Sequence, residues 1–355
     1  MADFAQNVPL APLTTLGLGG PARFYAEAHS ETELQDALAA ARTQELDVQI
    51  LGGGSNTVFP DSGYRGLVVR VGLRGVRFAD DGEGVLATAA AGEDWDAFVA
   101  LCVAKGLQGL ECLSGIPGSV GATPIQNVGA YGQEVSQTLV EVRALDRATL
   151  EEVTFSGPEC AFSYRSSRFK AQDAGRHAIL AVSYRLRRGA RPSLGYPELA
   201  RAAQALGVPE AEPGDALKLT RHAVLTLRRG KSMVYDPQDP HSHSVGSFFL
   251  NPVLDDAAYR TLCERLRLRF PEDPPEPPVF PADGGRKVPA AWLIERVGFT
   301  RGLRRGGVGI SRNHTLALVN YDGTTSELLA LAREIQAGVE RAFGVRLQPE
   351  PVIVS

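Results

Sequence analysis

Residues 115–132 read GIPGSVGATPIQNVGAYG, a stretch without a single charged side chain. It contains five glycines, and its only sizeable apolar or aromatic residues are Ile116, Val120, Ile125, Val128 and Tyr131. A segment of this composition cannot build a hydrophobic core by itself. Its neutral, backbone-rich surface suits a ligand that needs many N–H donors, either an uncharged molecule or a diphosphate.

A second glycine-rich stretch lies nearer the N-terminus, where residues 50–58 read ILGGGSNTV. Glycine lets backbone N–H groups approach an anion closely, and Ser55 and Asn56 add side-chain donors. The stretch is neither G-x-G-x-x-G nor a P-loop, because the Gly-Lys-Ser/Thr of a P-loop is missing. Taken alone it fits a tight turn after a strand equally well. Two such stretches in one half of the chain favour a dinucleotide site that is not of the Rossmann type.

The composition is that of an ordinary globular protein of two or three domains, with 355 residues, 44% hydrophobic and 22% charged. The net charge of −4 gives no general attraction to nucleic acid or to an anionic membrane. We therefore expect small-molecule partners, with no nucleic acid and no membrane. A monomer is expected.

The N-terminus, MADFAQNVPLAPLTTLG, lacks the basic and apolar regions of a signal peptide, and no apolar run reaches membrane-spanning length. The four cysteines form no C-x-x-C pair and no metal-ligand spacing, and the six histidines contain no H-E-x-x-H motif. These features predict reduced, mostly buried thiols in a cytoplasmic protein without a metal site.

Apolar periodicity and capping signals predict a mixture of helices and strands. A helix is expected from Ser30, because Ser30 and Glu33 form an S-x-x-E capping box. The apolar stripe behind this box comprises Leu34, Ala37, Leu38 and Ala41. Further helices are expected at about 94–106, 290–297 and 324–343, and strands at 48–51, 67–71, 85–91, 140–144, 180–186, 315–320 and 347–354. The elements do not alternate strictly, which indicates α+β domains.

Two segments are expected to be irregular. RRGARP, residues 187–192, is typical of a linker or loop. The proline-rich segment FPEDPPEPPVFPADGG, residues 270–285, is predicted to contain no regular element and to follow the surface as an extended connector.

The stretch SVGSFFLNP, residues 244–252, places one hydroxyl, that of Ser247, between Gly246 and two phenylalanines. It is too apolar for an ordinary surface loop. From the stretch alone, the simplest interpretation is a serine that caps a turn beside Gly246.

Five motifs occur together in a consistent order and spacing, namely ILGGGSN, GIPGSVGATPIQNVGAYG, SYRSSRF, GSFFLNP and LQPEP. Through them the chain resembles the UDP-N-acetylenolpyruvoylglucosamine reductase family over about residues 14–354. The resemblance implies an α+β protein with a two-subdomain FAD-binding fold of the vanillyl-alcohol-oxidase (PCMH) type and a smaller C-terminal substrate domain. It implies FAD-binding subdomains at 1–70 and 71–226, the latter with the substrate loop. A substrate-binding domain is implied at 227–349, and the strand at about 350–355 is expected to return to the first subdomain.

The implied reaction is the NADPH-dependent reduction of UDP-N-acetylglucosamine enolpyruvate to UDP-N-acetylmuramate in peptidoglycan precursor synthesis. FAD mediates it and is expected to bind non-covalently, because neither glycine-rich stretch contains a histidine. The implied FAD-binding residues are Gly52, Gly53, Gly54, Ser55, Asn56, Pro117, Gly118, Gly121, Ala122, Gln126, Asn127, Gly129 and Ala130.

Three residues match catalytic positions of the family. Arg165 in SYRSSRF matches the arginine that meets the substrate carboxylate. On the residues alone a structural salt bridge is the simpler reading, and Arg168 is an equal candidate. Glu350 matches the glutamate that helps hold the developing enolate, and the simpler alternative is an exposed strand-edge charge. Ser247 matches the proton donor to the adjacent carbon.

Four residues match substrate contacts: Tyr164, Tyr196, Lys231 and Asn251. Tyr196 matches a tyrosine that some members carry on a mobile loop over the substrate diphosphate. Lys231 departs in spacing, because RRGKSMVYDP places the lysine further from Asp-Pro than most members do. Leu250 and Val245 stand where other members often have lysine and alanine.

Two other kinds of protein would share some of these features. An oxidase of the same fold that uses O₂ often attaches FAD covalently through histidine. A non-enzymatic module that binds a sugar nucleotide would explain the glycine-rich stretches but would leave Arg165, Ser247 and Glu350 without a role.

Overall fold

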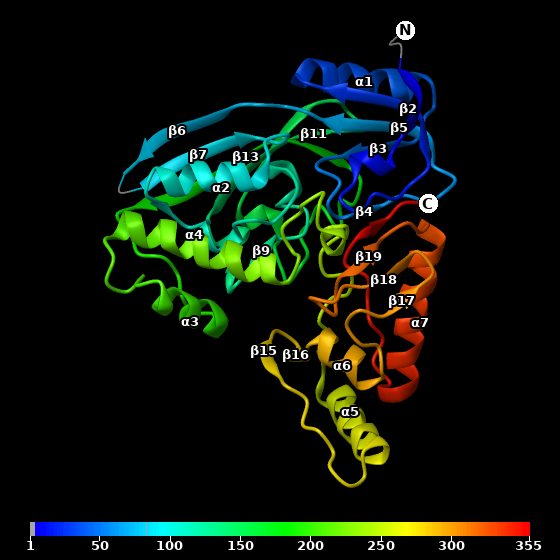
Figure 1. The fold of residues 1–355 in the computed structure, drawn as a ribbon. Helices are drawn as coiled ribbons and strands as arrows, with labels where there is room; N and C mark the ends of the chain where they lie inside the picture. Colours follow the sequence, from blue (N-terminus) through cyan, green and yellow to red (C-terminus); the bar gives the residue numbers. More distant parts are fainter. Residues whose placement is uncertain (1–3, 83) are drawn as a thin grey trace. The chain divides into compact units, whose positions relative to one another are not determined.

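The computed structural model describes residues 4–82 and 84–355, which form two compact units (Figure 1). The first unit contains the chain up to Pro9, Pro21–Gly54 and Tyr64–Val234. The second contains Leu10–Gly20, Ser55–Gly63 and Tyr235–Ser355. The implied domain boundaries at residues 70 and 226 stay predictions.

The first unit contains a four-stranded sheet with the order β1–β2–β5–β3. Its strands are β1 (Ala5–Pro9), β2 (Pro21–Ala28), β5 (Tyr64–Val71) and β3 (Val48–Leu51). β1 runs antiparallel to β2, whereas β2, β5 and β3 are parallel. Helix α1 (Glu31–Thr43) makes the crossover between β2 and β3 that a parallel pair requires.

The predicted start of α1 is confirmed. The side chain of Ser30 accepts a 3.1 Å hydrogen bond from the backbone N–H of Glu33, and the Glu33 carboxylate accepts one from His29. These bonds satisfy backbone donors that the first turn of a helix leaves unpaired. The predicted apolar stripe is buried in the core of the first unit.

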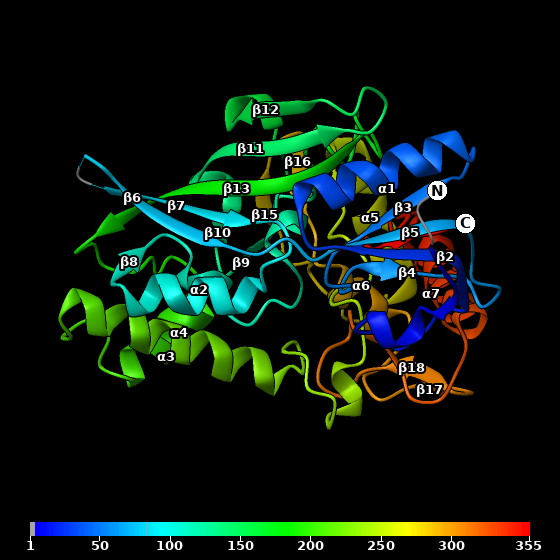
Figure 2. The same cartoon turned by 90° about the horizontal axis from the view of Figure 1, so that it is seen from above.

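A larger antiparallel sheet completes the first unit, with the order β12–β11–β13–β7–β6 (Figure 2). Its strands are β12 (Glu152–Ser156), β11 (Leu139–Asp146), β13 (His177–Arg188), β7 (Gly84–Ala90) and β6 (Val76–Asp81), and β8 (Leu107–Gln108) pairs with the end of β13. β13 extends into the predicted linker at 187–192, because Arg187 and Arg188 pair with β8.

The other helices and the short hairpin of the first unit are α2 (Trp95–Ala104), α3 (Pro197–Ala205), α4 (Pro213–Gly230), β9 (Gly129–Ala130) and β10 (Gln133–Glu134). α2 lies alongside α4 in both views (Figures 1 and 2). Trp95 and Phe98 of α2 pack on Tyr184 of β13 with ring centroids 5.8 and 5.6 Å away. One hydrophobic core therefore joins the helices to the large sheet.

The second unit is built from short strands and three helices. These elements are β4 (Thr57–Val58), β14 (Val253–Leu254), β15 (Phe280–Ala282), β16 (Gly285–Lys287), β17 (Arg304–Arg305), β18 (Val308–Ile310), β19 (Leu318–Asn320), β20 (Val352–Ile353), α5 (Asp256–Arg269), α6 (Ala290–Arg296) and α7 (Thr325–Phe343). β20 pairs in parallel with β4, so the last strand does return to the N-terminal third of the sequence. The predicted capping box of Thr324 and Glu327 begins α7, and Gly344 ends it with a φ of 70°.

The prediction that residues 270–285 contain no regular element is wrong at one end. Phe280–Ala282 forms β15, which pairs with β16 in the order β14–β16–β15. Pro281 is tolerated because β15 is an edge strand, where a missing N–H does not interrupt the sheet. Asp283 and Gly284 connect the two strands, and Gly284 has a φ of 85°. Asp-Gly is a typical sequence for such a two-residue hairpin turn.

Candidate active site

Within the first unit, Gly52 and Gly53 of the first glycine-rich stretch lie against Gly118 and Ser119 of the second. A Cβ added to Gly52 would lie 2.5 Å from Oγ of Ser119, and one added to Gly53 would lie 2.7 Å from Cα of Gly118. Neither position can hold a side chain without displacing its neighbour. Backbone atoms therefore make up much of the contact between the two stretches, and the diphosphate site expected there stays a prediction.

Hydrogen bonds to the segment before α2 fix the second stretch in place. The N–H of Gly121 donates to the carbonyl of Ala91, and the N–H of Val120 donates to the carbonyl of Glu93, both at 2.9 Å. The N–H of Trp95 donates in turn to the carbonyl of Gly118 at 3.0 Å. The loop is therefore held at three successive points rather than left to move.

Asn127, a predicted FAD contact, uses its side chain inside the protein. Its amide donates to the Glu134 carboxylate at 2.8 Å and to the Ser163 carbonyl at 3.2 Å, and its oxygen accepts from the N–H of Ser136 at 3.2 Å. Asn127 is buried and has a φ of 46°. Its side chain shapes the loop, so any contact with a cofactor falls to its backbone.

Arg165 and Arg168, which the sequence left as equal candidates, have different surroundings. Arg168 forms an ion pair with Asp173 at 2.7 Å and lies over the ring of Phe155, 4.3 Å from its centroid. The Arg165 guanidinium donates to the carbonyl of Gly129 at 2.6 Å, on the second glycine-rich stretch. Arg168 is thus held in a structural ion pair, whereas Arg165 contacts the loop predicted to bind FAD.

Four residues near the predicted substrate loop form one cluster. The ring of Tyr131 meets that of Tyr196 edge to face, with centroids 5.5 Å apart. The Lys231 ammonium lies 5.8 Å from the centroid of Tyr131 and donates a 2.6 Å hydrogen bond to the carboxylate of Glu198. Burial, the largest cause, raises the pKa of Tyr131 to about 12, so its hydroxyl stays protonated.

In the second unit, the segment around Ser247 is anchored by its two phenylalanines. Phe248 and Phe249 are buried with ring centroids 5.2 Å apart, and the N–H of Phe248 donates to the carbonyl of Leu316 at 2.7 Å. Gly246 has a φ of 75°, and its N–H donates to the hydroxyl of Ser244. Ser244, and not Ser247, is therefore the serine that caps this turn.

Glu350 lies on a segment paired with the one that carries Ser247. Phe249 forms an antiparallel bridge with Pro349, and the N–H of Glu350 donates to the carbonyl of Phe248 at 2.9 Å. The structure thus brings two of the three predicted catalytic residues onto neighbouring segments of one unit. Arg165 belongs to the other unit.

Asn251, a predicted substrate contact, caps a helix. Its side-chain oxygen accepts a 2.9 Å hydrogen bond from the N–H of Ala290, the first residue of α6. Such a bond satisfies a donor that the helix leaves unpaired. The amide nitrogen of Asn251 and the second lone pair of its oxygen could then meet a ligand.

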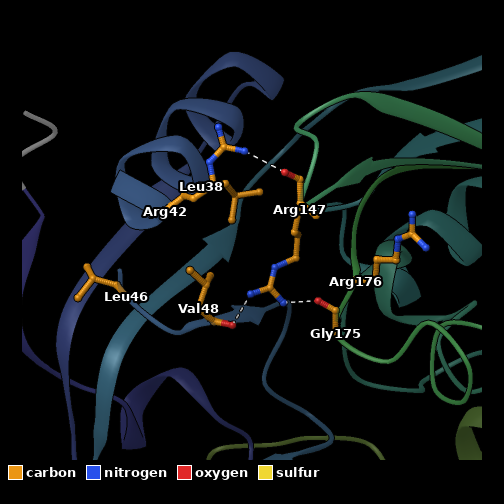
Figure 3. A pocket seen from close by; sticks show the side chains of 8 residues that line it. Leu38, Arg42, Leu46, Val48, Arg147, Gly175 and Arg176 are labelled. Carbon is orange, nitrogen blue, oxygen red and sulfur yellow. Dashed lines mark hydrogen bonds between the residues drawn. The ribbon is translucent and has the colours of Figure 1, made fainter. Parts of the chain in front are cut away.

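A cavity of about 340 Å³ in the first unit lies between α1 and two turns of the larger sheet (Figure 3). Arg147 crosses it and donates to the carbonyls of Val48 and Gly175, and Arg42 donates to the carbonyl of Ala148. None of the residues that line it is a predicted site residue. The cavity is therefore not part of the candidate active site.

Residues 4–82 and 84–355 contain no group of three His, Cys, Asp or Glu side chains suited to a metal ion, and no helix among them is long and apolar enough to cross a membrane. The four cysteines are free thiols. Burial raises the pKa of Cys102 and Cys160 to about 12, which keeps both thiols protonated and unreactive.

Family models match both halves of the chain. The C-terminal domain of UDP-N-acetylenolpyruvoylglucosamine reductase matches residues 237–354, and an FAD binding domain matches residues 22–155. A reductase of this name from Thermobifida fusca is 48% identical over 360 residues, covering 99% of this chain and 98% of the relative. One from Streptomyces avermitilis is 50% identical, covering 98% and 94%. The chain belongs to the UDP-N-acetylenolpyruvoylglucosamine reductase family.

A solved reductase structure from Thermus caldophilus confirms the predicted fold. It superimposes with a TM-score of 0.66 at 23% identity, covering 99% of this chain and 98% of the other. The protein therefore has the FAD-binding fold of the vanillyl-alcohol-oxidase type with a smaller C-terminal α+β domain. It is an FAD-dependent oxidoreductase that reduces an enolpyruvyl ether of UDP-N-acetylglucosamine in peptidoglycan precursor synthesis.

Two residues of the cluster around Lys231 were not among the predicted site residues. Tyr131 lies in the glycine-rich residues 115–132, and its signal was the single aromatic ring in that stretch. Glu198 gives no signal in the sequence, because only the fold of the chain between α3 and the end of α4 brings it to Lys231.

Proposed function

We propose that this reductase takes its hydride from NADPH and that Arg165, Glu350 and Ser247 complete the reduction of the enolpyruvyl group. Bound FAD supplies the hydride-transfer chemistry between NADPH and the terminal alkene carbon. We further propose that the FAD is held without a covalent bond and that the enzyme works as a monomer in the cytoplasm. The use of NADPH and the three catalytic roles rest on the resemblance of the sequence motifs, and non-covalent binding rests on the absence of histidine from both glycine-rich stretches.

The proposed FAD site is centred on the close contact of Gly52 and Gly53 with Gly118 and Ser119. Its support is the fit of the residues there, since Gly52 and Gly53 leave no space for a side chain beside Gly118 and Ser119. Backbone N–H groups in such a setting stabilise the charge of a diphosphate. The residues proposed to hold FAD are those implied by the sequence: Gly52, Gly53, Gly54, Ser55, Asn56, Pro117, Gly118, Gly121, Ala122, Gln126, Asn127, Gly129 and Ala130.

Hydride addition to the terminal alkene carbon leaves negative charge on the adjacent carbon and on the carboxylate bonded to it. A guanidinium fork matches the geometry of a carboxylate, which is the role proposed for Arg165. Glu350 in its neutral form donates a hydrogen bond to the same developing charge. Hydrogen bonds formed only at that stage lower the barrier and not merely the dissociation constant.

Ser247 is proposed to deliver the proton that completes the reaction. The hydroxyl O–H bond breaks, a C–H bond forms at the carbon next to the carboxylate, and the alkoxide is re-protonated by neighbouring groups. The observation that carries this proposal is the pairing of the Ser247 segment with the Glu350 segment through Phe248 and Phe249. Within the described residues, the Ser247 hydroxyl has no hydrogen-bond partner, whereas Ser244 has taken over the capping role.

Tyr164, Tyr196, Lys231 and Asn251 are proposed to bind the substrate. Support comes from the cluster in which Lys231 and Tyr196 both contact the ring of Tyr131. We also propose the domain division at 1–70, 71–226 and 227–349 as the functional one.

Absorption spectra of the purified holoenzyme test this function. NADPH added without oxygen is expected to bleach the yellow flavin, and UDP-N-acetylglucosamine enolpyruvate is expected to restore the colour while it is reduced. Colour that returns only with O₂ would instead identify an oxidase. A protein that stays colourless after incubation with FAD would overturn the proposal.

A further inference from the structure

The ion pair between Glu198 and Lys231 is short and partly shielded from solvent. The two charged atoms lie 2.6 Å apart, and each side chain is about one third exposed, at 33% and 34%. The Lys231 ammonium also lies over the ring of Tyr131, a half-buried residue, 5.8 Å from its centroid. Partial burial and a cation–π contact both make this pair less open to solvent than a simple surface pair.

The fold holds Glu198 in this position. Tyr196 occupies the N-cap position of α3 and Pro197 follows, which places Glu198 in the first helical turn. A carboxylate there is stabilised by the positive end of the helix dipole. Leu199 on the next position is buried against Ala223 and Val224 of α4, so α3 cannot rotate freely.

The chain before Tyr196 is fixed as well. The buried carboxylate of Glu111 accepts a 3.1 Å hydrogen bond from the N–H of Ser193. The Cys112 thiol donates to the carbonyl of Ser193 at 3.3 Å. Glu198 therefore meets Lys231 from a segment anchored on both sides of Tyr196.

We propose that Glu198 is a specificity-determining residue that competes with the substrate's diphosphate for Lys231. This rests on the proposed role of Lys231 as a substrate contact. The carboxylate and a phosphate are both anionic acceptors for one ammonium group, and placing them side by side costs Coulomb energy. A ligand with two phosphate charges displaces Glu198, whereas a ligand without phosphate cannot do so.

Isothermal titration of the FAD-loaded enzyme with UDP and with uridine tests this role. In Glu198→Gln the dissociation constant of UDP is expected to fall about fivefold. The reason is that Lys231 no longer has to leave a partly exposed ion pair before it meets the diphosphate. That of uridine is expected to stay unchanged. Asp215→Asn is the matched control, because Asp215 forms a 2.9 Å pair with Lys218 on the exposed face of α4. It is expected to change neither constant.

A second background separates this proposal from the function it rests on. In Lys231→Met the dissociation constant of UDP is expected to rise, and adding Glu198→Gln to this variant is expected to have no further effect.

An unchanged or weakened UDP affinity in Glu198→Gln overturns the proposal while leaving the reductase function intact. If Lys231→Met leaves UDP binding unchanged, the role of Lys231 fails, and with it the competition. If wild-type holoenzyme neither binds UDP nor turns over, the proposed function itself has failed. Thermal unfolding of each variant shows whether it is folded.

Discussion

The backbone N–H of Glu350 donates a 2.9 Å hydrogen bond to the carbonyl oxygen of Phe248, the residue directly after Ser247. The buried rings of Phe248 and Phe249 hold one side of this pairing. The antiparallel bridge between Phe249 and Pro349 holds the other. A predicted proton donor and a predicted enolate ligand thus share one backbone scaffold, and substitutions of either side chain leave that scaffold intact.

Ser247→Ala is expected to separate the two half-reactions. Flavin reduction by NADPH should stay nearly normal, and oxidation of the reduced enzyme by substrate should slow about 10²- to 10⁴-fold, because the proton donor is lost. Stopped-flow absorbance measures each step. Ser244→Ala serves as the control, since that hydroxyl caps the turn at Gly246, and its second step should be close to normal. Equal slowing of both steps in Ser247→Ala would contradict the assignment.

Glu350→Gln keeps the shape of the side chain and the backbone pairing but removes the acidic proton. We expect the second half-reaction to slow about 10²-fold or more, because the amide N–H that replaces the acidic O–H stabilises the developing charge less well. The thermal unfolding temperature should not change, because the bond to Phe248 is made by the backbone. A variant with normal single-turnover rates would show that Glu350 is only a strand-edge charge.

The sequence predicted most of the elements whose signals are local. The stripe of α1 and its cap at Ser30 depend on residues within one or two turns, and the cap and end of α7 are similarly local. Helices α3, α4 and α5 are missing from the predicted elements. α4 does carry a helical period in Ala216, Leu217, Thr220, Ala223 and Val224, and a proline in its first turn. Strand β15 was missed because the many prolines of residues 270–285 outweighed the Asp-Gly turn signal that follows the strand.

The roles within the candidate site could not be read from local signals. Arg165 and Arg168 are three residues apart and chemically identical, and only the ion pair with Asp173 and the contact with Phe155 distinguish them. Likewise, the turn-capping role that fits Ser247 belongs to Ser244, because Gly246 turns its N–H toward the earlier serine. Such choices depend on contacts between distant residues and on exact backbone direction.

Gly53→Ala is expected to weaken FAD binding. The new Cβ would lie 2.7 Å from Cα of Gly118, so the two glycine-rich stretches would have to move apart. Overpacking of this kind raises the FAD dissociation constant about tenfold or more. The ratio of flavin to protein absorbance after gel filtration measures the loss. Gly214→Ala is the control, because a Cβ there in the first turn of α4 meets nothing within 4 Å. Full FAD retention in Gly53→Ala would contradict the proposed FAD site at the contact between Gly53 and Gly118.

Asp61 is expected to stabilise the second unit in a pH-dependent way. Burial alone would raise its pKa, but hydrogen bonds from the Ser326 side chain and from the N–H groups of Ser326 and Thr325 outweigh burial and lower it. A lowered folded-state pKa gives stability that is complete above the ordinary value and lost as pH falls through the folded value. Asp61→Ala should cost about 1–2 kcal/mol at neutral pH, as for a lost helix cap.

Urea unfolding of wild type and Asp61→Ala at several pH values measures this difference, which should shrink below about pH 4. Asp322→Ala is the control. It removes an exposed carboxyl just before α7, the helix that begins at Thr325, and should change the free energy of unfolding little. If the difference in the free energy of unfolding stays constant down to the acid transition, the charge of the Asp61 carboxylate does not stabilise the first turn of α7.

Arg165→Lys and Arg168→Lys form a matched pair of substitutions that separates catalysis from stability. Lysine keeps the charge of Arg165 but cannot present a fork to a carboxylate, so the second half-reaction should slow about 10- to 100-fold while flavin reduction stays normal. Arg168→Lys should leave both half-reactions close to normal and lower the free energy of unfolding by about 1–2 kcal/mol, because the pair with Asp173 and the stacking on Phe155 are weakened. Single-turnover kinetics and urea unfolding of both variants measure these effects. If Arg168→Lys slows the second half-reaction as much as Arg165→Lys does, the contact of Arg165 with Gly129 does not identify it as the arginine that binds the substrate carboxylate.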